Sequence, residues 1–271
     1  IAVQTGMDGV DVEIHGSVKD ILRDPFLEIF MGSRVDLARA VLLADKSAPA
    51  LKGAVDLALS VKGNLENPEV KLSIHSKEAR VKAYAFESFK LDAGMNNWLL
   101  MLGPSGFSSK QGNLSLAGQV NLGKAFPKGA KGPLELDEIS YDLNAVLDEV
   151  DLSALQEAGL KSKGRLTSRI NVQGRGIDPE KIKADIRAQV SATGLWVEGM
   201  PDSMDGDLHA DIGLDRLNAG IRSINLTTPE IAVTGHGSVD IPAMEISAQL
   251  DLEAADIGLL DRLTRVKGRR N

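Results

Sequence analysis

The residues that come closest to a metal-binding pattern are three polar side chains in one alternating segment. Asp207, His209 and Asp211 are separated by single residues, so on a strand they would project from the same face. Carboxylates and imidazoles bind divalent metals, but no fourth ligand stands nearby in the sequence. We favour a solvated polar face for these residues, and we expect no metal and no cofactor.

Other candidates for chemistry are weaker. Ser105 stands between glycines in the segment 103–106 (GPSG), but the Gly-x-Ser-x-Gly spacing of a nucleophile elbow is absent. The segments 174–176 (GRG) and 235–237 (GHG) are too short for a phosphate-binding loop, and neither opens a helix. His15 and His75 occur at no ligand spacing. The sequence therefore predicts no catalytic residue and a protein that is not an enzyme.

Composition excludes several classes of protein. The chain has 271 residues, of which 43% are hydrophobic but only 4% aromatic, so an apolar interior must be mainly aliphatic. A net charge of −7 argues against nucleic-acid binding, and zero cysteines exclude disulfides and thiolate sites. No apolar run approaches the roughly 18 residues of a spanning helix. The chain begins at Ile1 without a signal-peptide pattern, and we expect it to be a piece of a longer protein.

Alternation of apolar and polar residues dominates the chain. Val55, Leu57 and Leu59 alternate with more polar or smaller residues, and the segments 182–190 and 243–252 repeat this period, which is that of a strand. Counting such segments predicts roughly sixteen strands and two or three short helical turns.

The segment 141–174 combines both kinds of element and partly recurs. It predicts a strand, a short helix with Asp151 as N-cap and Gly159 at its end, and a second strand. The pattern of 147–155 (LDEVDLSAL) returns at 252–260 (LEAADIGLL), where Asp256 follows Asp151 by 256 − 151 = 105 residues.

Glycines, prolines and other residues that interrupt regular structure give further predictions. Gly16 should end the first strand, residues 19–23 should form a helical turn, 34–44 fits either a short helix or a strand, and 78–86 should be a separate strand. The Gly-rich, Ser-rich and Pro-rich stretches 103–112 and 123–133 predict loops around a strand at 113–122. These features divide the chain into a first unit, 1–102, a connecting segment, 103–133, and a second unit, 134–271, that continues the same sheet.

The fold class follows from the one-sided strands. Nearly every strand has one apolar face, yet few amphipathic helices exist to cover it. Open sheets rarely exceed about ten strands without curling or splitting. We therefore expect an all-β protein, a long curled antiparallel β-sheet that forms a groove or half-pipe, with glycines allowing its bends. A closed sandwich or barrel with a dry core is the alternative.

Three segments resemble the AsmA-like superfamily of bacterial envelope proteins, of the AsmA/TamB type. They are 61–70 (VKGNLENPEV), 147–155 (LDEVDLSAL) and 164–174 (GRLTSRINVQG). The resemblance implies a periplasmic segment of a protein anchored to the inner membrane outside this chain. It implies a repeating β-groove that carries phospholipid between the inner and outer membranes. The implied partners are phospholipid acyl chains, the two membranes through parts outside this chain, and outer-membrane assembly proteins.

An aliphatic groove would bind acyl chains through many equivalent side chains rather than one decisive residue. The predicted groove-lining residues are Val55, Leu57, Leu59, Leu72, Ile170, Ile186, Ile212, Ile224, Ile246 and Leu250.

Two rival functions remain at this stage. A structural β-scaffold could assist outer-membrane protein assembly by pairing with an exposed edge strand. A carbohydrate-active enzyme would need paired carboxylates with aromatic platforms, and few aromatics are present. The basic cluster at 262–270 could touch anionic headgroups, although we favour a solvated terminus.

Overall fold

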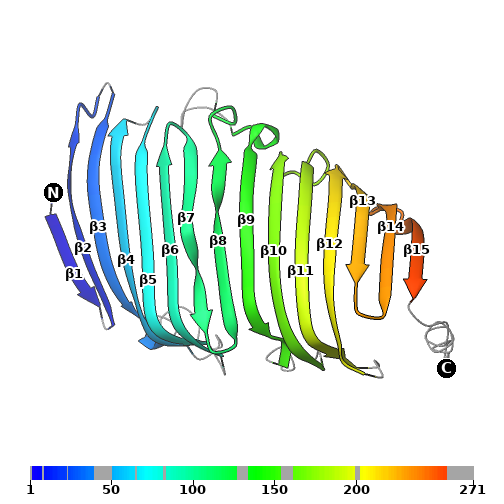
Figure 1. Ribbon diagram of the computed structural model, residues 1–271. Coiled ribbons are helices and arrows are strands. Elements are labelled where there is room, and N and C mark those ends of the chain that lie inside the picture. Colours follow the sequence, from blue (N-terminus) through cyan, green and yellow to red (C-terminus); the bar gives the residue numbers. More distant parts are fainter. Residues whose placement is uncertain are drawn as a thin grey trace.

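The computed structural model describes residues 2–7, 9–22, 24–39, 51–64, 66–81, 84–126, 134–153, 161–198 and 202–254. Fifteen strands form one antiparallel sheet, and each strand pairs with its neighbours in sequence (Figure 1). The order runs from β1 to β15 without closing on itself. The protein is therefore all-β, a single long curled sheet, as the sequence predicted.

The strands follow the alternation of apolar and polar residues closely. Their bounds are β1 (Ala2–Met7), β2 (Val10–Lys19), β3 (Phe26–Asp36), β4 (Leu51–Asn64), β5 (Glu69–Val81), β6 (Tyr84–Asn96), β7 (Leu99–Ser109), β8 (Gly112–Asn121), β9 (Ser140–Asp151), β10 (Ser162–Arg175), β11 (Lys183–Val197), β12 (Met204–Asp215), β13 (Asn218–Thr227), β14 (Ile231–Asp240) and β15 (Glu245–Ala254). Helical structure in the described chain is limited to short turns at 37–39, at η2 (Leu136–Glu138) and at 152–153.

Cross-strand register gathers the apolar residues into rows. Directly opposed residues in antiparallel strands share a face, so the pairs can be followed from strand to strand. The central row runs across β2 to β15 as Ile14, Met31, Leu59, Leu72, Ala93, Leu102, Gly118, Leu143, Val172, Ile186, Ile212, Ile221, Gly237 and Ala248. One uncharged stripe thus crosses the sheet.

Parallel rows widen this stripe into a whole face. A row from Gly16 to Ile246 lies nearer the upper edge in Figure 1, and a row from Val10 to Leu252 lies nearer the lower edge. Between the central and lower rows lies a further set, which runs from Leu116 to Leu250 across β8 to β15. None of the described residues in these rows is charged. We call this surface the apolar face and the opposite surface the polar face.

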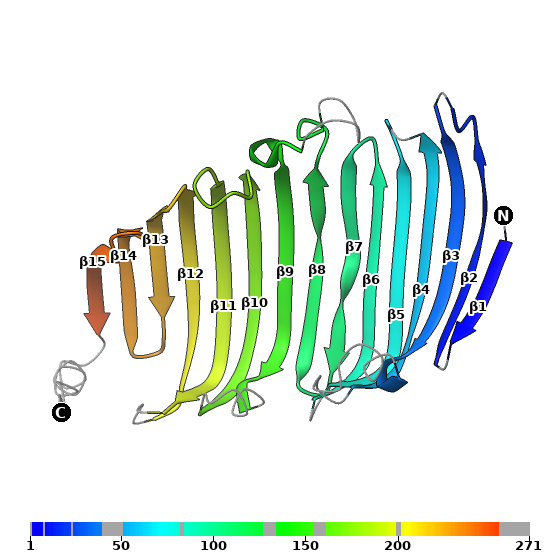
Figure 2. The ribbon, with the colours of Figure 1, turned by 180° about the vertical axis from the view of Figure 1, so that it is seen from behind.

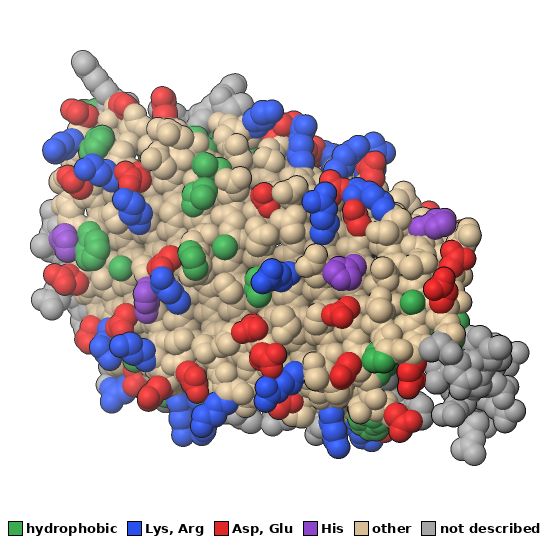
Figure 3. Space-filling model, in the orientation of Figure 1, with side chains coloured by type: hydrophobic (Ala, Val, Ile, Leu, Met, Phe, Trp, Pro, Cys, Tyr) green, Lys and Arg blue, Asp and Glu red, His purple; other side chains and the backbone are tan. Residues whose placement is uncertain are grey.

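The polar face can be seen directly. Figure 3 shows the surface seen in Figure 1, which carries Lys, Arg, Asp, Glu and His side chains. This surface is the polar face. Figure 2 gives the view from behind, toward the apolar face.

Within the described part of the chain, no second layer covers the apolar face. Among the described residues, no large side chain is less than 2% exposed. The accessible surface is 18072 Å², whereas a compact chain of this mass would have about 11,400 Å². The closed sandwich or barrel with a dry core is therefore wrong, because such a core would bury many large side chains completely.

The sheet bends near its lower edge, and the apolar face lies inside the bend. Gly53 and Gly164 have φ of 110° and 107°, and the register shifts at both positions, as β-bulges require. The lower ends of the strands sweep sideways in Figure 1. Ser76 and Ser168, on the apolar face toward this edge, are only 4% and 3% exposed. Side chains converge inside a bend, so the apolar face forms a trough.

Several local expectations were wrong because strand pairing overrides short-range signals. Gly16 does not end the first strand, since β2 continues through it to Lys19. Residues 103–109 are not a loop but part of β7, where a bulge between Leu102 and Ser105 accommodates Pro104. Fifteen strands replace the roughly sixteen expected.

Other elements shift in their bounds. Residues 78–86 are not one strand, because β5 ends at Val81 and β6 begins at Tyr84. Residues 20–22 form a turn without a helix. Of the segment 34–44, residues 34–36 are strand and residues 37–39 form a helical turn, and the remainder lies outside the described residues. The predicted strand at 113–122 is confirmed as β8.

Asp151 makes the local hydrogen bond that a cap needs, but most of the helix that it was predicted to cap lies outside the described residues. Asp151 ends β9, and its carboxylate Oδ1 accepts a hydrogen bond from the Ser153 backbone N–H at 2.9 Å. Gly159 and Asp256 lie outside the described residues. The sheet runs through the described part of 103–133 without a break, and the proposed unit boundary there stays a prediction.

The close approach of β8 and β9 at Gly118 gives a stability test. A Cβ at Gly118 would lie 2.3 Å from the Asp142 carbonyl oxygen, whereas one at Gly94 would meet nothing nearer than 3.8 Å. We expect Gly118→Ala to lower the free energy of unfolding by about 1–3 kcal/mol, because the strands must separate. Gly94→Ala serves as the control and should cost less. Equal urea midpoints for the two variants would contradict the close approach.

Candidate functional site

The apolar trough is the candidate site, and all ten predicted lining residues fall on its face. Leu59, Leu72, Ile186 and Ile212 belong to the central row. The other six lie in adjacent rows of the same face: Val55, Leu57, Ile170, Ile224, Ile246 and Leu250. Contact of these residues with a lipid stays a prediction.

Exposure of these side chains varies with position in the sheet. On interior strands the lining residues are half-buried, because neighbours stand on both sides. On β15, Ile246 is 75% and Leu250 60% exposed, since this edge strand has a neighbour on one side only. The trough is therefore open to solvent along its length and most open at β15.

The dimensions suit an extended apolar ligand. Fourteen spacings between fifteen strands, at about 4.8 Å each, give a width of roughly 67 Å. Four rows two residues apart give a height of about 20 Å. The hydrocarbon core of a bilayer is about 30 Å thick and contains two layers of tails. Several acyl chains could therefore lie end to end in the trough.

One aromatic residue, Tyr141, covers backbone on the apolar face. Tyr141 pairs with Gly174 across β9 and β10, and a Cβ at Gly174 would lie 2.6 Å from the Tyr141 hydroxyl. The phenol ring therefore covers the bare glycine backbone. Partial burial raises the pKa of Tyr141. Alternation placed Tyr141 on this face, but only register revealed the glycine beneath it.

Sequence reasoning missed the residues that complete the central row. Met31, Leu102, Leu143, Val172 and Ile221 stand directly opposite predicted lining residues or continue their row. Their alternation was visible in the sequence. Their alignment depends on pairing between neighbouring strands, which no single segment encodes.

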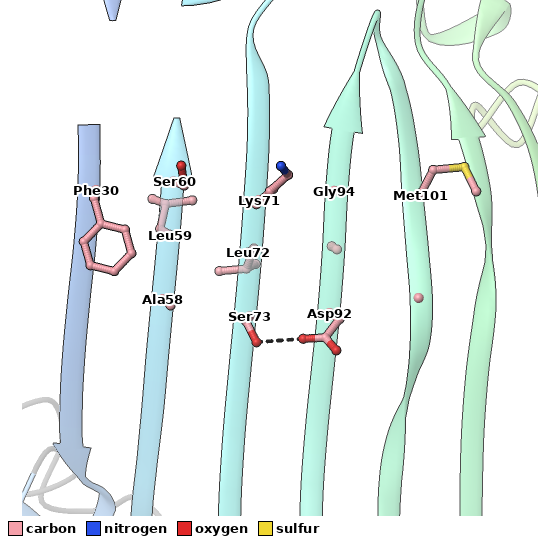
Figure 4. A pocket seen from close by; sticks show the side chains of 12 residues that line it. Phe30, Ala58, Leu59, Ser60, Lys71, Leu72, Ser73, Asp92, Gly94 and Met101 are labelled. Carbon is pink, nitrogen blue, oxygen red and sulfur yellow. Dashed lines mark hydrogen bonds between the residues drawn. The ribbon is translucent and has the colours of Figure 1, made fainter. Parts of the chain in front are cut away.

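A second hollow lies on the polar face rather than in the trough. It has a volume of about 480 Å³ and spans β3 to β7 (Figure 4). Small residues such as Ala58 and Gly94 leave its floor open, and the partly exposed side chains of Phe30 and Met101 stand at its sides. The hollow results from a lack of bulk across neighbouring strands.

Polar groups at this hollow form a hydrogen-bonded cluster without the layout of a catalytic triad. Ser73 Oγ lies 2.7 Å from the Asp92 carboxylate and 2.7 Å from His75 Nε2. The same Nε2 lies 3.4 Å from Asp92. In a triad the two ring nitrogens contact different partners, one orienting and one reacting. Here one nitrogen serves both, and Ser73 donates directly to the carboxylate.

The cluster perturbs one carboxyl group strongly. Hydrogen bonds from Lys90, at 2.6 Å, and from Ser73 lower the pKa of Asp92 to about 2. The carboxylate therefore stays charged in mild acid. Its contribution to stability is complete above the ordinary aspartate pKa of about 3.9 and is lost as pH falls through about 2.

The pKa of Asp92 can be measured by carboxyl NMR titration. We expect a midpoint near 2 in the unmodified protein, and a midpoint closer to the ordinary aspartate value in Lys90→Met, because the largest cause of the shift is removed. An unchanged midpoint in the variant would show that Lys90 is not responsible.

The metal candidate does not assemble a site. Asp207 accepts a hydrogen bond from Ser191 at 2.5 Å, and Asp211 accepts one from Arg222 at 2.7 Å. Arg222 also pairs with Asp185, and these acidic partners raise its pKa. No group of three His, Asp or Glu side chains in the described chain is arranged to hold a metal. The carboxylates instead bind neighbouring side chains across the polar face.

Two further observations bear on membranes. The basic cluster at 262–270 lies outside the described residues. Within the part of the chain that is described, no helix is long and apolar enough to cross a bilayer.

Comparison with known proteins provides no assignment. No protein-family model, no curated protein and no solved structure matches this chain. The candidate site is therefore defined by its own geometry, an open trough in which the described row residues from β2 to β15 carry no charge over a width of about 62 Å.

Proposed function

We propose that this chain is a periplasmic segment of an AsmA-like envelope protein and that its trough holds phospholipid acyl chains in transit between the inner and outer membranes. The observation that carries the proposal is the uncovered apolar face, in which no described row residue from β2 to β15 is charged. A globular protein buries such a surface, whereas a lipid conduit leaves it open for its ligand.

The energetics of lipid movement favour such a surface. An acyl chain exposed to water costs about 0.8 kcal/mol per methylene, or roughly 12 kcal/mol for a sixteen-carbon tail. A continuous aliphatic wall offsets most of this cost at every position along the sheet. Since no single residue anchors the tail, movement between neighbouring positions meets no large barrier.

The proposed role requires no catalysis. Binding depends on apolar contact, which is non-directional, and the polar cluster at Ser73, His75 and Asp92 lies on the opposite face. The proposed partners are phospholipid tails. The inner and outer membranes would be reached through parts outside this chain, and an inner-membrane anchor would lie there too.

A charge placed in the trough should abolish lipid occupancy. Ile186 occupies the central row on β11, and Gln189 lies on the opposite face of the same strand. We expect Ile186→Asp to remain folded but to lose co-purifying phospholipid, because a carboxylate opposes an acyl chain. Gln189→Asp adds the same charge to the polar face and should retain lipid.

Native mass spectrometry with lipid extraction, after expression in a bacterial envelope, measures this occupancy. Phospholipid bound to the unmodified protein and to Gln189→Asp, but absent from Ile186→Asp, would support the proposal. An apo mass for all three, with no uptake from labelled liposomes, would overturn it.

An alternative function is a β-scaffold that assists outer-membrane protein assembly by strand pairing. The exposed edge strand β15 favours it, because its Ile246, Leu250 and Leu252 are 45–75% exposed. The segment also contains no proline and no lysine, the residues that usually protect an edge.

A strand-pairing test separates the two functions. We expect a labelled amphipathic β-strand peptide to bind the edge weakly. The backbone carbonyls of Ser247 and Gln249 face β14, so the N–H of Ala248 points to the open edge. Ala248→Pro should therefore reduce peptide binding and any concentration-dependent self-association, because proline cannot donate to a ladder. Peptide binding in the absence of lipid binding would favour the scaffold. A monodisperse monomer that binds no peptide across a concentration series would exclude edge pairing.

A further inference from the structure

Most of the exposed large hydrophobic side chains lie along one edge of the sheet. We define the loop rim as the loops that join β2 to β3, β4 to β5, β6 to β7, β8 to β9, β10 to β11, β12 to β13 and β14 to β15, all at the upper edge in Figure 1. Fourteen exposed large hydrophobic residues occur in the described part of the chain, and eight of them belong to the loop rim or adjoin it: Ile21, Leu22, Phe26, Leu134, Leu136, Ile177, Ile241 and Met244.

The described turns at the opposite edge are different in character. Gly9 turns the chain between β1 and β2, Lys110 and Gln111 lie between β7 and β8, and residues 228–230 (TPE) lie between β13 and β14. None of these turns carries an exposed large hydrophobic residue. The apolar side chains of the rim are therefore not a general property of the loops that have been described.

Side-chain contacts brace neighbouring rim loops against one another. Asn64 donates to Asp24 at 3.2 Å, and Asn67 donates to Asn97 at 2.7 Å. These bonds link three successive loops. These contacts fix the positions of the neighbouring loops relative to one another, so these loops are not independent.

Trp98 is the centre of this bracing. Its indole N–H donates to the Glu66 carbonyl oxygen at 2.8 Å, and its ring stacks on Phe126 with centroids 4.5 Å apart. Its φ of 59° places it in the left-handed region, which a bulky residue rarely adopts. The aromatic pair stands at the rim between the β4–β5 and β8–β9 loops. Tryptophan commonly occupies the boundary between apolar and aqueous phases.

The arrangement fits a lipid surface better than a protein pocket. From the β2–β3 loop to the β14–β15 loop the rim spans twelve strand spacings, roughly 58 Å. Its apolar side chains stand in four separate loops along this length. A protein partner would need a matching socket for each loop, whereas a bilayer accepts apolar side chains at any spacing. We propose that the loop rim docks on the surface of a lipid bilayer with these side chains inserted at headgroup level.

The charge of the rim loops is mixed. In the sequence of these loops there are eight acidic and six basic side chains: Asp20, Asp24, Glu66, Glu135, Asp137, Glu138, Asp178 and Glu180, against Arg23, Lys124, Lys128, Lys131, Lys181 and Arg216. The acidic excess is small, so the contact rests on insertion of the apolar side chains rather than on attraction to charged headgroups. A zwitterionic bilayer is therefore the appropriate probe. This conclusion does not depend on what the trough holds.

The two tryptophans of the chain report directly on this contact. Trp98 lies at the rim, and Trp196 lies at the far end of β11, toward the opposite edge. In Trp196→Phe, brominated phosphatidylcholine vesicles should quench the remaining Trp98. In Trp98→Phe, Trp196 should be quenched little. Equal quenching of both, or of neither, overturns the proposal.

Flotation with phosphatidylcholine vesicles tests the side chains. The triple variant Leu22→Ser, Ile177→Ser, Met244→Ser should lose vesicle binding by about tenfold or more, because three apolar insertions are removed. The matched control, Phe30→Ser with Met101→Ser, removes exposed apolar side chains from the polar face and should bind within about twofold of the unmodified protein. Circular dichroism confirms that both variants remain folded.

A trough variant separates rim docking from lipid uptake. Ile186→Asp should still float and still show quenching of Trp98, because the substitution lies away from the rim. Loss of flotation in Ile186→Asp, with the triple rim variant unaffected, would show that the trough rather than the rim touches the bilayer.

Discussion

The register of antiparallel pairing is the constraint on which the rest of this structure depends. Side chains alternate with a period of two, so a slip of one residue in any pair of strands would move a whole set of aliphatic side chains to the other face. The observed register keeps Leu59 opposite Leu72, and Ile186 opposite Ile212. Bulges at positions such as Gly53 and Gly164 insert residues near the lower edge without disturbing this alignment.

Stability in such a sheet must come mainly from neighbouring strands, because the described residues form a single layer. Every large contact surface joins strands adjacent in sequence, and the half-buried apolar side chains pack mainly against cross-strand partners. Polar groups inside the bend are satisfied locally, as when Ser76 donates to the Ala54 carbonyl oxygen at 2.8 Å. Because the described sheet is a single layer, its apolar face is available to a ligand. The same single layer explains why few side chains are fully buried.

The two faces and the loop rim divide the surface by chemistry. Charges on the polar face form cross-strand pairs, such as those of Arg222 with Asp185 and Asp211, and they keep this side solvated. The hollow beside Phe30 also lies on this face, where small side chains leave space between neighbouring strands. Apolar side chains fill the trough and reappear on the loops of one edge. The proposed lipid contacts are the trough and the rim, where the apolar side chains lie.

The sequence by itself determined the strands, their apolar faces and the absence of helices able to cover them, because alternation such as that of Val55, Leu57 and Leu59 is a local property. It also placed a local hydrogen bond at the Asp151 carboxylate, because an Asp side chain accepts from the backbone N–H groups of the next turn. Local signals misplaced Gly16 and Pro104, since a ladder can pass through a glycine or a bulge. Only the tertiary structure decided that the apolar residues align in continuous rows, that the sheet remains open, and that Trp98 and Phe126 meet at the rim. Those features depend on pairing between segments and on the bend of the whole sheet, which no single segment encodes.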